Sequence, residues 1–142
     1  MSYTTETQDS SLTQEIVKKI RILIVDDQNL ICKLIPIALE AEPDLEVVGM
    51  ANDGATALEL GTKLQPDIAL IDIEMPGIDG IEITRKFGEF SSPTKVVIFS
   101  NYEQQEYIDA AFDAGARGYL SKNISAEELA RAIRFIDRNY VH

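Results

Sequence analysis

Short aliphatic runs alternate with helical stretches along most of this chain, and this alternation is the feature that most constrains its fold. The aliphatic runs lie at 20–25, 45–50, 67–71, 95–99 and 117–120. The spacing of apolar residues between them predicts helices at 29–41, 54–65, 79–88, 104–115 and 125–139. Runs this short and continuously apolar are typical of strands that are buried on both faces. Strands and helices that alternate in this way predict an α/β fold with a doubly wound parallel sheet.

Several residues mark where the predicted helices begin. Asp53 and Asp79 suit N-caps, because a short acceptor side chain at that position can bond a free backbone N–H. Ser125 and Glu128 have the spacing of a capping box. Pro36 is an exception to the helical pattern, since it falls inside the first predicted helix and removes a backbone donor. We therefore expect a kink at that position.

Composition and charge limit the functions open to the chain. With 142 residues, 45% of them hydrophobic, the chain suits one domain with a sizeable core. The formal net charge of -11 argues against direct binding to nucleic acid, whose phosphates would repel the chain. Cys32 is the only cysteine, so no intrachain disulfide can form, and a reducing cytoplasm is the expected compartment. No apolar run approaches the roughly 20 residues needed to span a membrane, so we expect no membrane association.

The start of the chain differs in composition from the rest. Residues 1–11 are polar, which predicts a disordered tail. Leu12 and Ile16 have helical spacing, which allows one or two helical turns before the first strand. We therefore expect an N-terminal extension over 1–19 that is mostly disordered, with a short helix as the alternative, and a folded domain over 20–139.

Polar side chains stand where four of the predicted strands end. Asp26 and Asp27 follow the first run, Asp72 the third, Ser100 the fourth, and Lys122 comes just after the fifth. In an open parallel α/β sheet the carboxyl ends of the strands meet at one crevice, where such folds bind ligands. Three carboxylates gathered there favour a divalent cation such as Mg²⁺, which prefers oxygen ligands. A lysine and a hydroxyl beside them favour a phosphoryl group. The sequence therefore predicts an acidic pocket for phosphoryl transfer.

Asp72 is the candidate nucleophile of this pocket. A carboxylate can attack phosphorus and form an aspartyl phosphate. The cation and Lys122 would then balance the charge of the phosphoryl oxygens. Residues 26–29 also have a simpler interpretation, as a cap for the helix at 29–41. Because Asp72 and Lys122 are expected at the same edge of the sheet, the pocket is the better interpretation.

Motifs spread over residues 20–139 resemble the receiver domain of bacterial two-component response regulators, in the correct order and spacing. They are ILIVDDQ at 22–28, DIALIDIEMPGIDGIE at 67–82, KVVIFSN at 95–101 and AGARGYLSKNISAEEL at 114–129. The resemblance implies a flavodoxin-like (βα)5 fold with the strand order 2-1-3-4-5. It also implies a phosphoacceptor that is served by a sensor histidine kinase or a phosphotransfer protein.

The same resemblance assigns roles to the carboxylates. Asp72 would be the phosphoacceptor. Asp27, Asp72 and the backbone carbonyl of Glu74 would ligate Mg²⁺, and Asp26 would act on the metal mainly through water. Each of these assignments is an expectation that rests on the family.

The resemblance also assigns residues that would bind the phosphoryl group and residues that would change conformation after phosphorylation. Ser100 and Lys122 would bind the phosphoryl oxygens. Tyr119 matches the family's aromatic switch position, where the ring turns into the space that the Ser100 hydroxyl leaves. An ordinary half-buried strand tyrosine is the alternative. Tyr102 and Glu74 would tune the rate at which water attacks the phosphoaspartate.

The residue after Lys122 indicates which class of receiver domains the chain resembles most. Most receivers have proline there, whereas Asn123 and the run DLEVVGMANDGATAL at 44–58 are similar to receivers of the NarL/FixJ/LuxR-type class. Those usually carry a C-terminal helix-turn-helix domain that binds DNA. Residues 140–142 would be the start of a linker or a tail, so DNA would be bound only through a domain absent from this chain. An excised receiver, a natural single-domain regulator and a phosphorelay intermediate stay open.

Phosphorylation of such a receiver is expected to control a transcriptional output or to cause the receiver to form a homodimer. The surface around 104–115, or the helices at 29–41 and 125–139, would serve as the interface. The expected role is signalling, and the only catalysis would be the domain's own phosphorylation and dephosphorylation.

Two other classes fit parts of the pattern. A haloacid-dehalogenase-type phosphatase also uses an aspartate nucleophile and Mg²⁺. Its general acid would be an aspartate where this chain has Glu74, and its nucleophile would end the first strand rather than the third. A pseudo-receiver would dock partners without phosphorylation, but such modules usually lack part of the acidic set, which is complete here.

Overall fold

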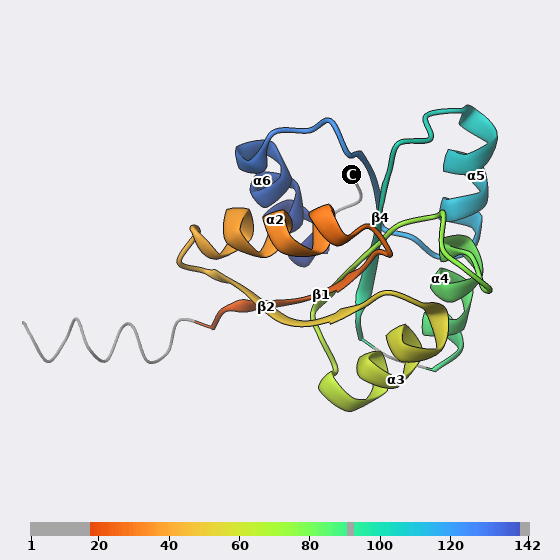
Figure 1. The fold of residues 1–142 in the computed structure, drawn as a ribbon, viewed down its shortest axis with the longest axis horizontal. Coiled ribbons are helices and arrows are strands. Elements are labelled where there is room, and N and C mark those ends of the chain that lie inside the picture. Colours follow the sequence, from red (N-terminus) through yellow and green to blue (C-terminus); the bar gives the residue numbers. More distant parts are fainter. Residues whose placement is uncertain (1–17, 91–92, 140–142) are drawn as a thin grey trace, which may run out of the picture.

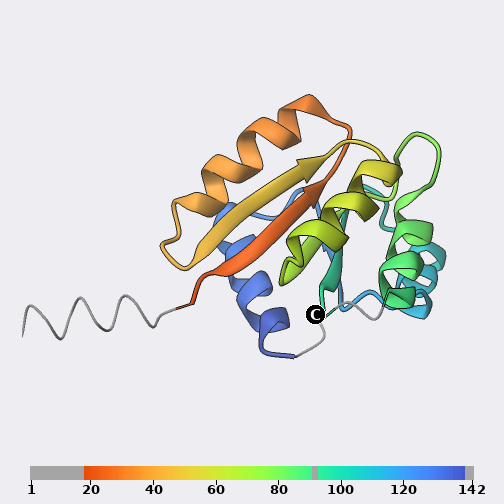
Figure 2. The same ribbon diagram turned by 90° about the horizontal axis from the view of Figure 1, so that it is seen from below.

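The computed structural model describes residues 18–90 and 93–139, which form a parallel sheet with helices on both faces (Figures 1 and 2). In chain order the elements are β1 (Ile20–Val25), α2 (Asn29–Glu40), β2 (Leu45–Ala51), α3 (Gly54–Leu64), β3 (Ile68–Ile71), α4 (Gly80–Glu89), β4 (Lys95–Ser100), α5 (Gln105–Asp113), β5 (Gly118–Ser121) and α6 (Ala126–Asp137). The predicted strands and helices are thus confirmed, with ends that shift by one or two residues. The tail and short helix expected before the first strand, and the last residues 140–142, lie outside the described residues.

The strands are all parallel and lie in the order β2-β1-β3-β4-β5, which confirms the doubly wound fold. The order reverses between β1 and β3, and this is the switch point at which such sheets leave a crevice at their carboxyl ends. In the register of the sheet, Val25 of β1 pairs with Ile71 of β3. The residues that follow them, Asp26 and Asp72, therefore leave the sheet side by side. No helix in the described ranges is both long enough and apolar enough to cross a membrane.

Two hydrophobic clusters hold the helices against the sheet. Successive residues of β1 serve opposite faces: Ile22 and Ile24 belong to one cluster, and Leu23 and Val25 to the other. The first cluster packs against α2 and α6, and the second against α3, α4 and α5. Figure 1 shows these two groups of helices on opposite sides of the strands. A strand segment buried in this way must be apolar at every position, as Ile22–Val25 of β1 and the whole of β3 are.

The predicted helix starts are confirmed in detail. The side chains of Asp53 and Asp79 each accept a hydrogen bond from a backbone N–H in the first turn of the helix that follows. Ser125 and Glu128 form the reciprocal bonds of a capping box. Pro36 lies inside α2 as expected, and the helix continues past it.

Gly80 brings the start of α4 against the end of β3. A Cβ at this position would lie well inside van der Waals contact with the carbonyl oxygen of Asp72, and 2.8 Å from Cα of Ile73. The N–H of Gly80 donates to the carbonyl oxygen of Ile73 at 2.8 Å. The turn before this contact contains Gly77, whose φ of +79° suits glycine. This close approach fixes the backbone of Asp72.

Candidate functional site

Three carboxylates gather at the carboxyl ends of β1 and β3, as predicted. Asp26, Asp27 and Asp72 each offer one oxygen, and these oxygens all lie within 4.8 Å of one another. Asp26 and Asp72 are buried, with 2% and 5% of their surface exposed, whereas Asp27 is exposed. Like charges at such distances repel one another by several kcal/mol where water is scarce. The cluster therefore needs positive charge nearby.

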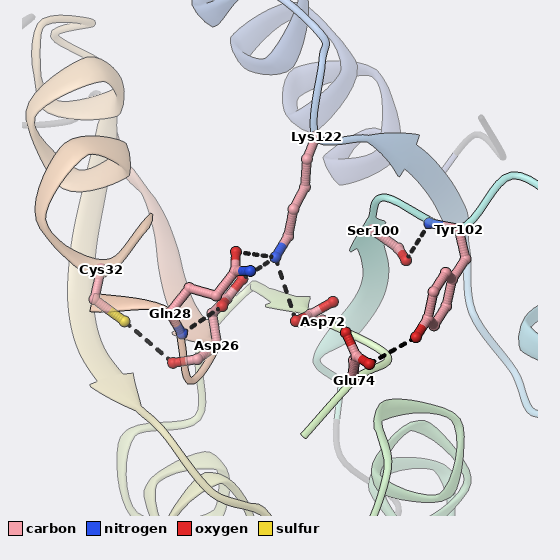
Figure 3. A network of polar contacts seen from close by, with 8 residues as sticks. All are labelled: Asp26, Gln28, Cys32, Asp72, Glu74, Ser100, Tyr102 and Lys122. Atoms are coloured by element: carbon pink, nitrogen blue, oxygen red, sulfur yellow. Dashed lines mark hydrogen bonds and ion pairs between the residues drawn. The ribbon is translucent and has the colours of Figure 1, made fainter. Parts of the chain in front are cut away.

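Lys122 brings positive charge into the cluster from the residue after β5. Its Nζ lies 2.8 Å from Asp26 Oδ2 and 3.2 Å from Asp72 Oδ2. Figure 3 shows the lysine side chain reaching down between these two aspartates. Only 5% of the lysine side chain is exposed, so the two carboxylates take the place of most of its hydration.

The surroundings of Asp72 make its charged, deprotonated form less favourable than in water. Burial is the main cause that raises the pKa of the Asp72 carboxyl above its ordinary value. The Lys122 ammonium acts in the opposite direction, and the nearby Asp26 carboxylate adds to the rise of the pKa. The charge of Asp72 is thus incompletely balanced, which favours the binding of a further cation.

The carboxylate cluster fits a hard divalent cation. All of its donor atoms are oxygens, which Mg²⁺ prefers. Although the Lys122 ammonium is 2.8 Å from Asp26 Oδ2, this buried oxygen accepts no hydrogen bond of regular geometry from the described residues. It therefore retains a free lone pair. The exposed carboxylate of Asp27 lies at the solvent side, where a hydrated ion can reach it.

A second polar group lies at the same edge of the sheet, around Tyr102. The Ser100 Oγ, which is buried, accepts a hydrogen bond from the Tyr102 N–H at 2.9 Å. The Tyr119 hydroxyl donates to the Tyr102 carbonyl oxygen at 2.7 Å. The Tyr102 hydroxyl in turn donates to Glu74 Oε2 at 2.7 Å, and its ring stacks on Tyr107 with the centroids 4.8 Å apart. Figure 3 shows Tyr102 and Glu74 meeting across the loops that follow β4 and β3.

The two residues of the predicted switch are neighbours within this group. Tyr119 is half-buried, and this burial is the main cause that raises the pKa of its phenol. A hydrogen-bonding interaction with the Ser100 side chain lowers that pKa and so opposes the effect of burial. The Tyr119 hydroxyl and the Ser100 Oγ also bond to the same residue, through the carbonyl oxygen and the N–H of Tyr102.

The structure thus places the predicted site residues in two adjoining groups. Asp26, Asp27, Asp72 and Lys122 form the acidic cluster. Ser100, in contrast, makes no hydrogen bond to that cluster among the described residues, and its contact runs to the loop after β4. The assignments of these side chains to metal and phosphoryl oxygens stay predictions.

Gln28 belongs to the acidic cluster, and sequence reasoning missed it. The sequence indicates only a helix-capping role, yet at the N-cap of α2 its side chain makes no capping hydrogen bond. Its Oε1 instead accepts a hydrogen bond from Lys122 Nζ at 2.9 Å. The available signal was its place directly after two aspartates at the end of β1.

Comparison with known proteins adds an independent observation. The family model described as "Response regulator receiver domain" matches residues 22–134. The transcriptional regulatory protein LiaR of Bacillus subtilis is 37% identical over 115 residues, which cover 81% of this chain and 54% of that protein. The response regulator GacA of Pseudomonas aeruginosa is 38% identical over 124 residues, covering 86% of this chain and 58% of that protein. The chain therefore spans just over half the length of these curated relatives.

Solved structures agree with this similarity. The signal receiver domain of the putative response regulator NarL from Mycobacterium tuberculosis matches with a TM-score of 0.83 and 33% sequence identity. The match covers 85% of this chain and 98% of that domain. The acidic cluster of this chain thus lies on a fold that matches nearly all of that receiver domain.

Proposed function

Because the chain belongs to the response regulator receiver domain family, we propose that Asp72 accepts a phosphoryl group from a phosphohistidine. The donor would be a sensor histidine kinase or a phosphotransfer protein. One observation carries the assignment: the Asp72 carboxylate is buried at the carboxyl edge of the sheet, 3.2 Å from the Lys122 ammonium. In this role the domain would work in the cytoplasm, the compartment expected from its lone cysteine.

The chemistry follows from the positions of these side chains. An oxygen of Asp72 would attack phosphorus, so that a P–O bond forms while the P–N bond to the donor histidine breaks. The released imidazole nitrogen takes up a proton. Lys122, which already faces Asp72, would donate to a phosphoryl oxygen and hold the transferred group in line.

The carboxylates would hold the metal that this transfer needs. We place Mg²⁺ on Asp27, Asp72 and the backbone carbonyl of Glu74, with Asp26 acting mainly through water. When bound, the ion would neutralise charge on the phosphoryl oxygens. The free lone pair of the buried Asp26 and the exposed position of Asp27 support this placement.

Phosphorylation would be converted into a change of shape through Ser100 and Tyr119. The Ser100 hydroxyl would turn toward the phosphoryl group, and the Tyr119 ring would move into the space beside it. The side chains of Tyr102 and Glu74, which bond to each other, would set the access of water to the phosphoaspartate. The hydrogen bonds around Tyr102 support this coupling, because they join all of these residues.

The partner surface we favour is the outer face of α2. Leu30, Leu34 and Ile37 have 65%, 51% and 70% of their surface exposed and follow one another at helical spacing. Leu30 is three residues past Asp27, so a protein that docks on this face also reaches the pocket. A kinase, a phosphotransfer protein or a second phosphorylated copy would bind there.

The output of the whole protein is a proposal of its own. LiaR is named as a transcriptional regulatory protein, and the similarity covers 54% of its length. We propose that 20–139 is the receiver domain and that DNA is bound through a further domain. A single-domain regulator or phosphorelay intermediate is the alternative.

The proposal is tested by incubating the protein with acetyl phosphate and Mg²⁺ and measuring its intact mass. The wild-type protein should gain one phosphate, and Asp72→Asn should gain none, because the amide is nearly isosteric but cannot form the acyl phosphate. Phosphate uptake by Asp72→Asn would rule out this residue as the acceptor. Turnover of p-nitrophenyl phosphate would point to a phosphatase instead.

A further inference from the structure

Three oxygens surround the ammonium of Lys122, and one of them has no part in the proposed chemistry. Asp26 Oδ2 lies 2.8 Å from Nζ, Gln28 Oε1 2.9 Å and Asp72 Oδ2 3.2 Å. The two carboxylate oxygens face the ammonium as ion pairs, whereas Gln28 Oε1 accepts a hydrogen bond of regular geometry from it. Two of the three oxygens thus belong to charged carboxylates, and the third belongs to the neutral amide of Gln28. Figure 3 shows the Gln28 side chain turned back from α2 toward the lysine.

Gln28 is itself held in place by the cluster. Its backbone N–H donates to Asp26 Oδ1 at 2.9 Å. Asp26 thus fixes Gln28 with one carboxylate oxygen while the other faces Lys122. The Gln28 side chain makes no capping bond to α2, so it is available to the lysine.

The lysine needs such a third contact because its side chain is long and flexible. Lysine carries its charge as a point at the end of a four-carbon stem. An N–H that lost its acceptor in this buried position would be left unsatisfied, and the ammonium would move toward water or deeper between the carboxylates. Of the three contacts, the one to Asp72 is the longest and therefore the easiest to exchange.

We propose that Gln28 is a positioning residue, which holds the Lys122 ammonium beside Asp26 while the contact to Asp72 is exchanged for a phosphoryl oxygen. The neutral amide suits this task, because it retains the ammonium without adding a charge that would compete with the phosphoryl group. The inference rests on the proposed phosphoacceptor function of Asp72.

Two substitutions at Gln28 separate the hydrogen bond from the shape of the side chain. Gln28→Met keeps the length of the side chain and loses the acceptor, whereas Gln28→Glu keeps an acceptor at the same place. Gln104→Met is the matched control, since Gln104 is also an N-cap glutamine without a capping side-chain bond, on α5. Its Oε1 accepts from the Glu103 N–H and does not contact Lys122.

The first measurement is made without a phosphodonor or metal, on the 142-residue chain. The Lys122 ammonium should give a resolved ¹H–¹⁵N NMR signal, assigned by its loss in Lys122→Met. It should persist in Gln28→Glu and Gln104→Met and should broaden or vanish in Gln28→Met. An unchanged ammonium signal in Gln28→Met would overturn the inference.

The second measurement is the initial rate of phosphorylation by acetyl phosphate with Mg²⁺. Gln28→Met should lower this rate about tenfold, which corresponds to about 1.4 kcal/mol and to the lower range for a hydrogen bond to a charged group. Gln104→Met should leave the rate unchanged. An equal loss in both variants would assign the effect to helix N-caps and overturn the positioning role. Failure of the phosphoacceptor proposal is seen separately, as phosphate uptake by Asp72→Asn.

Discussion

Replacing Gly80 with alanine should destabilise the domain and displace the backbone of Asp72. The added Cβ would lie within van der Waals contact of the Asp72 carbonyl oxygen and 2.8 Å from Cα of Ile73, and backbone atoms cannot turn away as a side chain can. Forcing an extra methyl into a packed site costs about 1–3 kcal/mol. Separating α4 from β3 would also stretch the 2.8 Å hydrogen bond from the Gly80 N–H, at about 1–3 kcal/mol for a buried group left unpaired. The expected loss is roughly 2–6 kcal/mol.

Urea denaturation followed by circular dichroism measures this loss, and Gly88→Ala is the matched control. Gly88 lies in the same helix, and a Cβ there would meet nothing within 4 Å. Alanine at that position should stabilise the helix by up to about 1 kcal/mol. Phosphate uptake by acetyl phosphate should fall in Gly80→Ala and stay normal in Gly88→Ala. A loss below 1 kcal/mol in Gly80→Ala would refute the argument that this contact admits only glycine.

Three further outcomes follow from the site. The raised pKa of Asp72 means that the folded state binds the proton of this carboxyl more tightly than the unfolded state does. The charged carboxylate therefore lowers the stability of the fold above the folded-state pKa. This cost disappears below the ordinary pKa of 3.8. Without metal, Asp72→Asn should therefore raise the free energy of unfolding at pH 7, with a difference that shrinks in acid titrations; a constant difference would contradict this. Mg²⁺ at 100 times its dissociation constant should stabilise the wild type by about 2.7 kcal/mol, and clearly less in Asp27→Ala, in thermal melts. Ser100→Ala should still take up phosphate, but beryllium fluoride and Mg²⁺ should shift the NMR signals of Tyr119 and residues 104–115 less than in the wild type; equal shifts would rule out coupling through Ser100.

The fold and the acidic cluster could be predicted because their signals are local in the sequence. A strand buried on both faces must be apolar throughout, as β3 is, and polar residues then mark where the strand ends. Asp26 and Asp72 stand at such ends, and the parallel register carries them to the same edge. Charge and residue type were enough to infer a cation and a phosphoryl group there.

Contacts that depend on side-chain direction could not be predicted in this way. Gln28 lies in the segment 26–29 that the sequence also allows as a helix cap, and only the structure shows that its amide turns to Lys122. The bond between the Tyr102 hydroxyl and Glu74 joins two loops whose relative position no sequence pattern encodes. The role of Gly80 likewise depends on how closely α4 approaches β3.

The backbone of Tyr102 offers a route by which phosphorylation at the pocket could affect the position of Tyr119. Its N–H donates to the Ser100 Oγ and its carbonyl oxygen accepts from the Tyr119 hydroxyl, so one residue holds both partners of the predicted switch. A hydroxyl that accepts a hydrogen bond can still donate its own proton. Ser100 can therefore keep its bond to this loop while its O–H turns toward a phosphoryl group. If Ser100 Oγ itself moved toward that group, we expect that the loop would follow and that the contact of the Tyr102 carbonyl with Tyr119 would loosen. A phosphoryl group can shift such an equilibrium only by the difference in its affinity for the two arrangements. In the proposed switch, phosphorylation would then have to favour a second arrangement over the one seen here, in which the Tyr119 hydroxyl is bonded to Tyr102.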